Sequence, residues 1–170
     1  MKTIMPFFVT VFLLLASVTP ISANMRPPTD LNAYIRVPFL KAITYDDVFD
    51  KAYDGKYIQL ECRFYGVMDG KLHELPYAYM YGEWHSPSSL PYEYNNSAWT
   101  GPIVLMDDSG NYTSQAVMPK AKADTLFKLK SADHVTVYAR LEVHLVAVST
   151  ASTIHYVLAP YLIINQITRS

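Results

Sequence analysis

Residues 57–68 read YIQLECRFYGVM, and this stretch decides the fold class because its side chains alternate in character along the chain. One phase is apolar, and the other carries charged or amide groups. A period of two is typical of a strand that buries one face. Gly66 falls near the far end, where a strand glycine often marks a bulge that lets a small sheet curl into a barrel. The apolar phase comprises Ile58, Leu60, Cys62 and Phe64.

The second half of the chain shows further strand and turn patterns. Residues 135–145 alternate cleanly, and residues 154–164 predict a last strand that Pro160 marks as an edge or a bulge. Residues 103–106 and 112–118 predict a hairpin around the turn sequence DDSGN at 107–111. Pro119 suits the first position of a helix that continues to about residue 130. The outward phase of 135–145 comprises Thr136, Tyr138, Arg140, Glu142 and His144.

The order of these elements is strand, long insertion, hairpin, helix and hairpin. It predicts an all-β domain with minor α content, a five-stranded OB-fold-like Greek-key barrel. One helix would lie between strands 3 and 4, and residues 69–101 would form a long insertion between strands 1 and 2.

Three segments resemble small secreted bacterial OB-fold domain proteins of the tRNA-anti-like OB superfamily. They are YDDVFDKAYDGKYIQL at 45–60, where Thr44 would cap a short helix, IVLMDDSG at 103–110 and LKSADHVTV at 129–137. The resemblance spans about residues 43–165. The chain departs from it at Ala132, where a glycine is usual, and in the length of the insertion. The resemblance implies a fold and a ligand-binding habit, with no catalytic site.

The first 42 residues predict export followed by an arm. Lys2, the apolar run 7–16 and the small residue Ala23 are typical of a signal peptide over residues 1–23. Prolines 27, 28 and 38 suggest an extended N-terminal arm over 24–42, before a single domain at 43–170. The expected location is therefore secreted or periplasmic, with no integral membrane segment after cleavage.

Charge and cysteine content exclude some function classes. Loss of Lys2 with the signal would leave 13 basic and 15 acidic residues, a formal net charge of −2. Phosphate backbones are bound mainly through clustered cations, so this balance argues against nucleic acid as a partner. Cys62 is the single cysteine and lies on an apolar strand phase, which favours a buried thiol over a nucleophile.

The insertion is rich in aromatic residues, and two interpretations stay open. Stacked rings there could hold a sugar, a base or an apolar peptide side chain. Alternatively, Tyr77, Tyr79 and Tyr81 could alternate because they form an extra strand that covers the barrel. The binding interpretation assigns ligand contacts to Tyr79, Tyr81, Trp84 and Trp99, with Tyr138 and Arg140 on the adjoining strand face.

Metal and catalytic patterns are sparse. If the last hairpin is centred between Ser149 and Thr150, His144 and His155 lie opposite each other, either as a metal-binding pair or as a solvated pair. No third ligand has diagnostic spacing, so we expect no metal and no other cofactor. Asp107 and Asp108 suit a turn better than a calcium loop. The sequence contains no G-x-S-x-G elbow and no P-loop.

These observations predict a non-enzymatic OB-fold binding module that uses the aromatic insertion to bind an envelope protein, a peptide or a glycan. A structural or assembly subunit of an envelope or secreted complex is the alternative. A metal-dependent hydrolase built around the histidines is a weaker one.

Overall fold

The computed structural model describes residues 26–43, 50–67, 78–80, 83–85, 92–110, 113–149 and 154–170. The N-terminal part contains the 3-10 helix η1 (Leu31–Ala33), β1 (Ile35–Arg36) and α1 (Phe39–Ile43). Next come β2 (Tyr57–Val67), β3 (Ala78–Met80), β4 (Glu83–His85) and the 3-10 helix η3 (Tyr92–Tyr94). The remainder is β5 (Trp99–Met106), β6 (Thr113–Pro119), the 3-10 helix η4 (Lys120–Lys128), β7 (His134–Ser149) and β8 (Ile154–Arg169).

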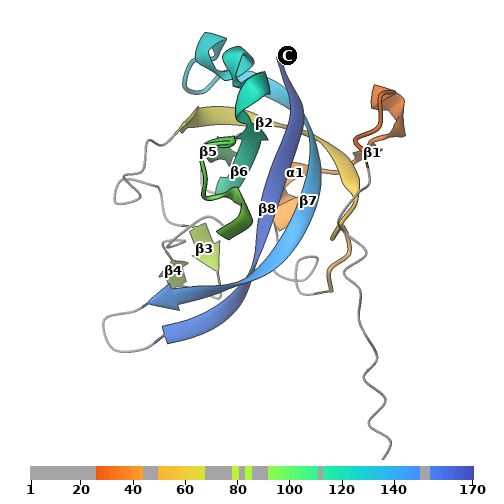
Figure 1. The fold of residues 1–170 in the computed structure, drawn as a ribbon. Coiled ribbons are helices and arrows are strands. Elements are labelled where there is room, and N and C mark those ends of the chain that lie inside the picture. The colour runs from red at the N-terminus through yellow and green to blue at the C-terminus, as the bar shows by residue number, and fades with distance from the viewer. Residues whose placement is uncertain are drawn as a thin grey trace, which may run out of the picture.

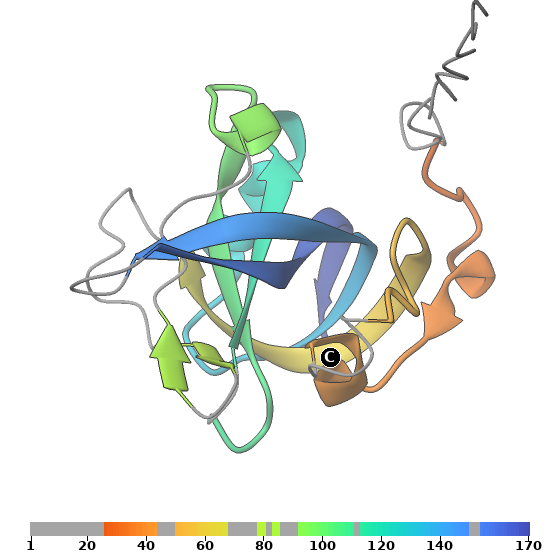
Figure 2. The same cartoon turned by 90° about the horizontal axis from the view of Figure 1, so that it is seen from below.

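Five of the described strands form a closed barrel (Figures 1 and 2). Their order is β2-β5-β6-β8-β7, and β7 pairs with β2 to close it. The pair β6–β8 is parallel, whereas the other barrel pairs are antiparallel. This is the Greek-key order of an OB-fold. The predicted fold class is confirmed, with residues 68–98 between the first two barrel strands.

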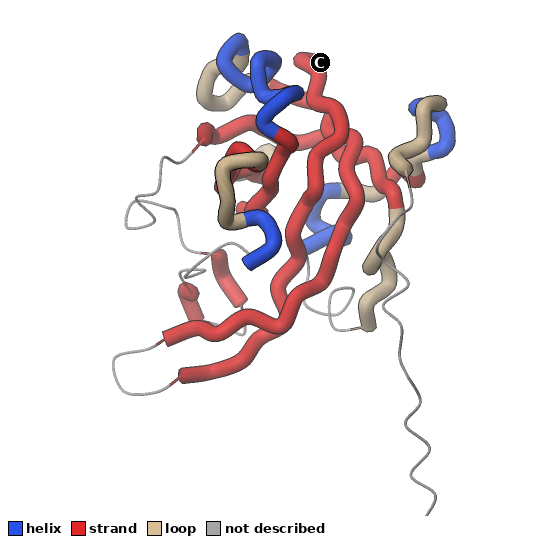
Figure 3. Tube along the Cα trace, in the orientation of Figure 1, coloured by secondary structure: helices blue, strands red, loops and turns tan. Residues whose placement is uncertain are grey.

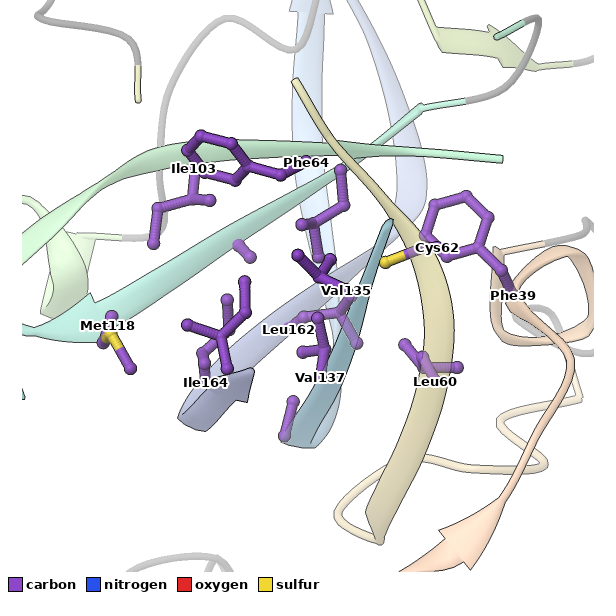
Figure 4. Packing of buried hydrophobic residues seen from close by; sticks show 14 of the residues in the cluster. Phe39, Leu60, Cys62, Phe64, Ile103, Met118, Val135, Val137, Leu162 and Ile164 are labelled. Atoms are coloured by element: carbon purple, nitrogen blue, oxygen red, sulfur yellow. The ribbon is translucent and has the colours of Figure 1, made fainter. Parts of the chain in front are cut away.

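Alternating side chains fill the barrel (Figure 4). Leu60 and Val137 are both fully buried, as the two strand patterns predict. Cys62 is also buried, and burial, followed by the negative charge of Asp108, raises the pKa of its thiol to about 12. The thiol therefore behaves as part of the core. Ten core residues are labelled in the figure: Phe39, Leu60, Cys62, Phe64, Ile103, Met118, Val135, Val137, Leu162 and Ile164.

The prediction of an extended arm over residues 24–42 is wrong from residue 31 onward. This segment forms η1, β1 and α1, and β1 pairs in parallel with β2. Phe39 and Ala42 of α1 lie in the main core. Pro38 directly precedes this short amphipathic helix, so it marks the start of a helix and not part of an extended arm. The helix expected near Thr44 falls largely on residues 44–49, outside the described residues, and residues 50–55 form turns.

Bulges and turns shape the barrel as the sequence suggested. The register between β2 and β5 shifts between Phe64 and Gly66, so the glycine does mark a bulge. Asp107 is buried in the β5–β6 turn, where its carboxylate accepts a hydrogen bond from the backbone N–H of Ser109 at 3.2 Å. Ala132 adopts a positive φ of 70° in the turn before β7. The residue that departs from the expected glycine therefore keeps the conformation that glycine favours.

The helical element between β6 and β7 is a 3-10 helix, η4, with Pro119 as its N-cap residue. It lies at the barrel end nearest the C-terminus (Figure 3). The last two strands, β7 and β8, run beyond the barrel as a long two-stranded ribbon that extends toward β3 and β4 (Figure 1). None of the described helices has the length and apolar character needed to cross a membrane.

Candidate functional site

The outer face of β6, β8 and β7 carries two rows of paired residues. One row places Gln115, Tyr161 and Glu142 side by side across the three strands. The next row places Val117, Ile163 and Arg140 side by side. Alternation explains this arrangement, because the neighbouring residues of each strand point into the core. Polar and aromatic groups are thus gathered on one exterior surface.

Glu142 is the centre of a hydrogen-bonded group on this surface. The Tyr94 hydroxyl donates to its Oε2 atom at 2.6 Å, and Nε2 of His144 lies 2.9 Å from the same oxygen. The Arg140 guanidinium donates to Oε1. The Arg140, Glu142 and His144 side chains are only 18%, 12% and 23% exposed. We call Glu93, Tyr94, Arg140, Glu142 and His144 the Glu142 network, because Glu93 approaches His144 from η3 with an Oε1–Nδ1 distance of 3.6 Å.

Aromatic rings border the Glu142 network. Tyr94 meets Trp99 edge to face, with ring centroids 4.8 Å apart, and both pack against Val117 and Ile163. The His144 ring makes a similar contact with Tyr161 at 5.5 Å. Such contacts restrict the rings and add to the energy of burial. The end of the insertion is therefore held against the barrel by both packing and hydrogen bonds.

The electrostatics of the network favour the charged forms of Glu142 and Arg140 and the neutral form of Tyr94. Burial alone would raise the pKa of the Glu142 carboxyl, but hydrogen bonds to His144 and Tyr94, together with the charge of Arg140, bring it below its ordinary value. Burial likewise opposes the charge of Arg140, and the carboxylate of Glu142 outweighs it, so the guanidinium pKa is raised. Burial first, and then the hydrogen bond to Glu142, raises the pKa of Tyr94. The tyrosine therefore remains a donor, and Glu142 remains an acceptor.

A second aromatic group adjoins the network along β7. The Tyr34 ring meets the rings of Tyr57 and Tyr138 edge to face, at 5.7 and 5.3 Å. The Asn165 amide donates to the Tyr34 hydroxyl at 3.3 Å. Tyr57 pairs with Arg140 across β2 and β7. The outward row of β7 thus contacts two aromatic groups. Tyr138 meets Tyr34, and Glu142 accepts a hydrogen bond from Tyr94, which packs on Trp99.

Gln115 lies in the same row as Glu142, with Tyr161 between them. Its side chain is buried, yet neither amide atom has a hydrogen-bond partner among the described residues. Burying an amide without a partner costs about 1–3 kcal/mol, so such groups are uncommon in folded proteins.

The predicted site residues are placed in three regions. Trp99 begins β5 and packs on Tyr94, while Tyr138 and Arg140 share the outward phase of β7. Tyr79 and Trp84 are cross-strand partners in the small β3–β4 sheet, and Tyr81 lies outside the described residues. β3 includes Tyr79, whereas Tyr77, like Tyr81, lies outside the described residues.

The expected pairing of His144 with His155 is wrong. His144 pairs with Ala159, and His155 pairs with Val148. The last strand pair, Ser149 with Ile154, leaves residues 150–153 as the connection, so the hairpin is centred two positions later than expected. The sequence pattern could not reveal this shift, because small polar residues occur on both sides of the turn.

Sequence reasoning missed Tyr94 and Glu93 as partners of the β7 row. The row itself was legible, since Arg140, Glu142 and His144 share one phase of an alternating strand. No signal in residues 92–94 indicates that η3 lies over this row. The position of η3 over this row is set by the packing of Tyr94 and Trp99 on Val117 and Ile163.

Comparisons with known proteins identify no family. No protein-family model matches the sequence, and no curated protein matches it. Among solved structures, one similar chain is described as an aspartyl-tRNA synthetase from Leishmania major Friedlin, with 17% identity and a TM-score of 0.43. The match covers 88% of this chain and 24% of that one, so this chain spans about a quarter of the synthetase.

Proposed function

We propose that this chain is a secreted or periplasmic binding module of OB fold that holds a glycan on the outer face of β7. The observation that carries the proposal is the Glu142 network, whose Tyr94 ring packs against Trp99. A carboxylate, a guanidinium and aromatic rings on one surface supply the acceptor, the donors and the apolar faces that a hydroxyl-rich ligand needs. OB-folds are also a recurrent scaffold for oligosaccharide binding.

Two sequence features support the remaining parts of the proposal. The predicted signal peptide at 1–23 and the resemblance to small secreted bacterial OB-fold domains support an extracytoplasmic location and a binding role. The expected charge of −2 for the mature chain disfavours a nucleic-acid ligand. An envelope peptide or protein remains the other ligand class, and Trp99 with Tyr94 would serve as its apolar contact.

A defined titration tests the glycan proposal. The mature chain is titrated by calorimetry with purified muropeptides and, separately, with neutral chitin oligosaccharides. Arg140→Gln should weaken binding at least tenfold, because removing a charged hydrogen-bond donor typically costs about 1.5–3 kcal/mol. Arg63→Gln is the matched control, since Arg63 pairs with Asp108 at 3.2 Å and lies on β2. Equal loss in both variants, or no binding of either glycan by the wild-type chain, would contradict the proposal.

The location needs its own measurement. Intact mass spectrometry of the chain recovered from a cell envelope fraction should give the mass expected for cleavage after Ala23. A chain that keeps its N-terminus in washed membranes would show that residues 4–23 act as an anchor.

The assembly alternative is favoured by a different observation. Leu145 and Tyr156 are 65% and 70% exposed on the β7–β8 ribbon beyond the barrel. Large apolar groups on such a ribbon suit contact with another subunit. An assembly subunit should associate without added glycan, and Leu145→Glu should abolish that association. Sedimentation velocity over a concentration series separates this role from a monomeric binding module.

A further inference from the structure

Glu93, Glu142 and His144 form the group of possible metal ligands within the described residues. One ligand atom from each lies within 4.8 Å of the other two. Glu142 and His144 are two positions apart on β7, so they share its outward face. Glu93 reaches them from η3, which lies near the end of the long insertion. Residues distant in sequence are therefore brought to one point by the fold.

We propose that these three side chains bind a divalent cation, and that Zn²⁺ is the best match to their donor set. One imidazole nitrogen and two carboxylate oxygens are typical Zn²⁺ ligands, at about 2.0–2.2 Å from the ion. Ca²⁺ and Mg²⁺ instead favour sites made wholly of oxygen. Three protein ligands leave one tetrahedral position open for water or for an oxygen of a bound molecule.

Metal binding requires side-chain movement, because Glu93 Oε1 lies 3.6 Å from Nδ1 of His144 whereas Glu142 Oε2 lies 2.9 Å from Nε2. Ligand atoms in a tetrahedral zinc site lie roughly 3.3 Å apart, which follows from the usual bond lengths. One ligand atom of each residue lies within 4.8 Å of the other two, and His144 Nε2 lies 2.9 Å from Glu142 Oε2. The Glu93 side chain is 54% exposed, so its rotamers are free to close the remaining gap. The two β7 ligands are held by the strand.

The neighbours of Glu142 suit a supporting role around the ion. Arg140 donates to Oε1, while the Tyr94 hydroxyl donates to Oε2. Hydrogen bonds of this kind orient metal-binding carboxylates, and their loss commonly weakens metal binding about 10- to 100-fold. Two carboxylates and one guanidinium give the group a formal charge of −1, which a divalent cation converts to +1. The ion would join η3 to β7, and its binding requires no glycan.

Metal titration of the full mature chain, purified without a histidine tag and stripped with chelator, tests the site. Calorimetry with Zn²⁺ alone should show one equivalent bound. Glu93→Gln and His144→Gln should each lower the affinity at least tenfold. His134→Gln is the matched control, because His134 is 56% exposed and lies 3.6 Å from Asp108, on another part of the barrel. It should bind Zn²⁺ as the wild type does.

Co²⁺ provides an independent spectroscopic readout. Its visible absorption should intensify on binding to the wild type and to His134→Gln, but not to His144→Gln. Full affinity in Glu93→Gln or His144→Gln, or well under one equivalent in the wild type, would overturn the proposal. If His144→Gln melts early, Glu93→Gln decides the outcome, since the Glu93 side chain is 54% exposed and its replacement is expected to preserve the fold. Zinc binding without glycan binding, or the reverse, separates this site from the proposed function.

Discussion

Leu60 and Val137 are direct partners across the seam where β2 meets β7, and both side chains are fully buried. This pair closes the barrel: β2 is the first barrel strand, and β7 is the fourth. A closed barrel has no free edges, so the seam removes the two edges that an open five-stranded sheet would expose. The packing of this one pair therefore affects the whole core.

Truncating the seam should destabilise the protein strongly. Leu60→Ala is expected to cost about 2–5 kcal/mol of unfolding free energy, because it leaves a cavity in the core. Leu145→Ala is the control on the exposed ribbon and should change stability by about 0.5 kcal/mol or less. Urea unfolding followed by circular dichroism measures both. Equal urea midpoints for Leu60→Ala and Leu145→Ala would mean that Leu60 contributes no more to stability than an exposed residue does.

Replacing Ala132 with glycine should stabilise the protein. Ala132 has φ of 70°, a left-handed conformation that costs an L-residue roughly 1–2 kcal/mol. Glycine avoids this cost but has more freedom in the unfolded chain, so the expected net gain is about 0.5–1 kcal/mol. The backbone N–H of Ala132 donates to the carbonyl of Phe64 at 2.8 Å, which holds the turn in place. A lower thermal midpoint for Ala132→Gly would contradict this expectation.

The Glu142 network should make the free energy of unfolding fall as the pH is lowered into the acid range. The folded pKa of Glu142 lies below its ordinary value of 4.5, so its stabilising effect is present above that value and is lost as the pH falls through the folded pKa. Glu142→Gln should therefore have lower stability at pH 7 and a flatter decline below about pH 4.5. Glu61→Gln, at an exposed ion pair with Arg36, is the control. Urea midpoints from pH 7 to pH 3 should show the difference, and parallel curves for Glu142→Gln and wild type would refute it.

Trp99 should contribute moderately to stability. It is half-buried against Tyr94, so Trp99→Ala is expected to cost about 1–3 kcal/mol, less than removal of a fully buried ring. Phe127→Ala on η4 is the aromatic control, because Phe127 is 76% exposed. It should stay within about 0.5 kcal/mol of wild type. A Trp99→Ala loss as small as that of the control would mean that η3 needs no ring contact.

Strand phase was the predictable part of this fold. Leu60, Cys62 and Val137 are buried as their alternation predicts, because a period of two defines the core face directly. The same logic identified Arg140 and His144 as outward. It could not identify α1, since Pro38 is equally compatible with an extended arm and with the start of a helix.

Only the β7 part of the candidate site could be predicted from the sequence. Strand alternation orders residues along β7, but it says nothing of which loop covers them. Glu93 and Tyr94 reach the β7 row through tertiary packing around Val117 and Ile163. The register of the β7–β8 hairpin was also open, because the length of its turn decides whether Ala159 or His155 faces His144.

The hydrogen bond between Tyr34 and Asn165 joins residues 131 positions apart, and it has a kinetic consequence. Bringing together residues so far apart in the sequence costs chain entropy before the contact stabilises the fold. Barrels of this kind therefore fold slowly, commonly in milliseconds to seconds. Among the described strands, β8 is the partner of both β6 and β7. A variant without β8 would lack the strand that joins β6 to β7, so the barrel order could not form without it.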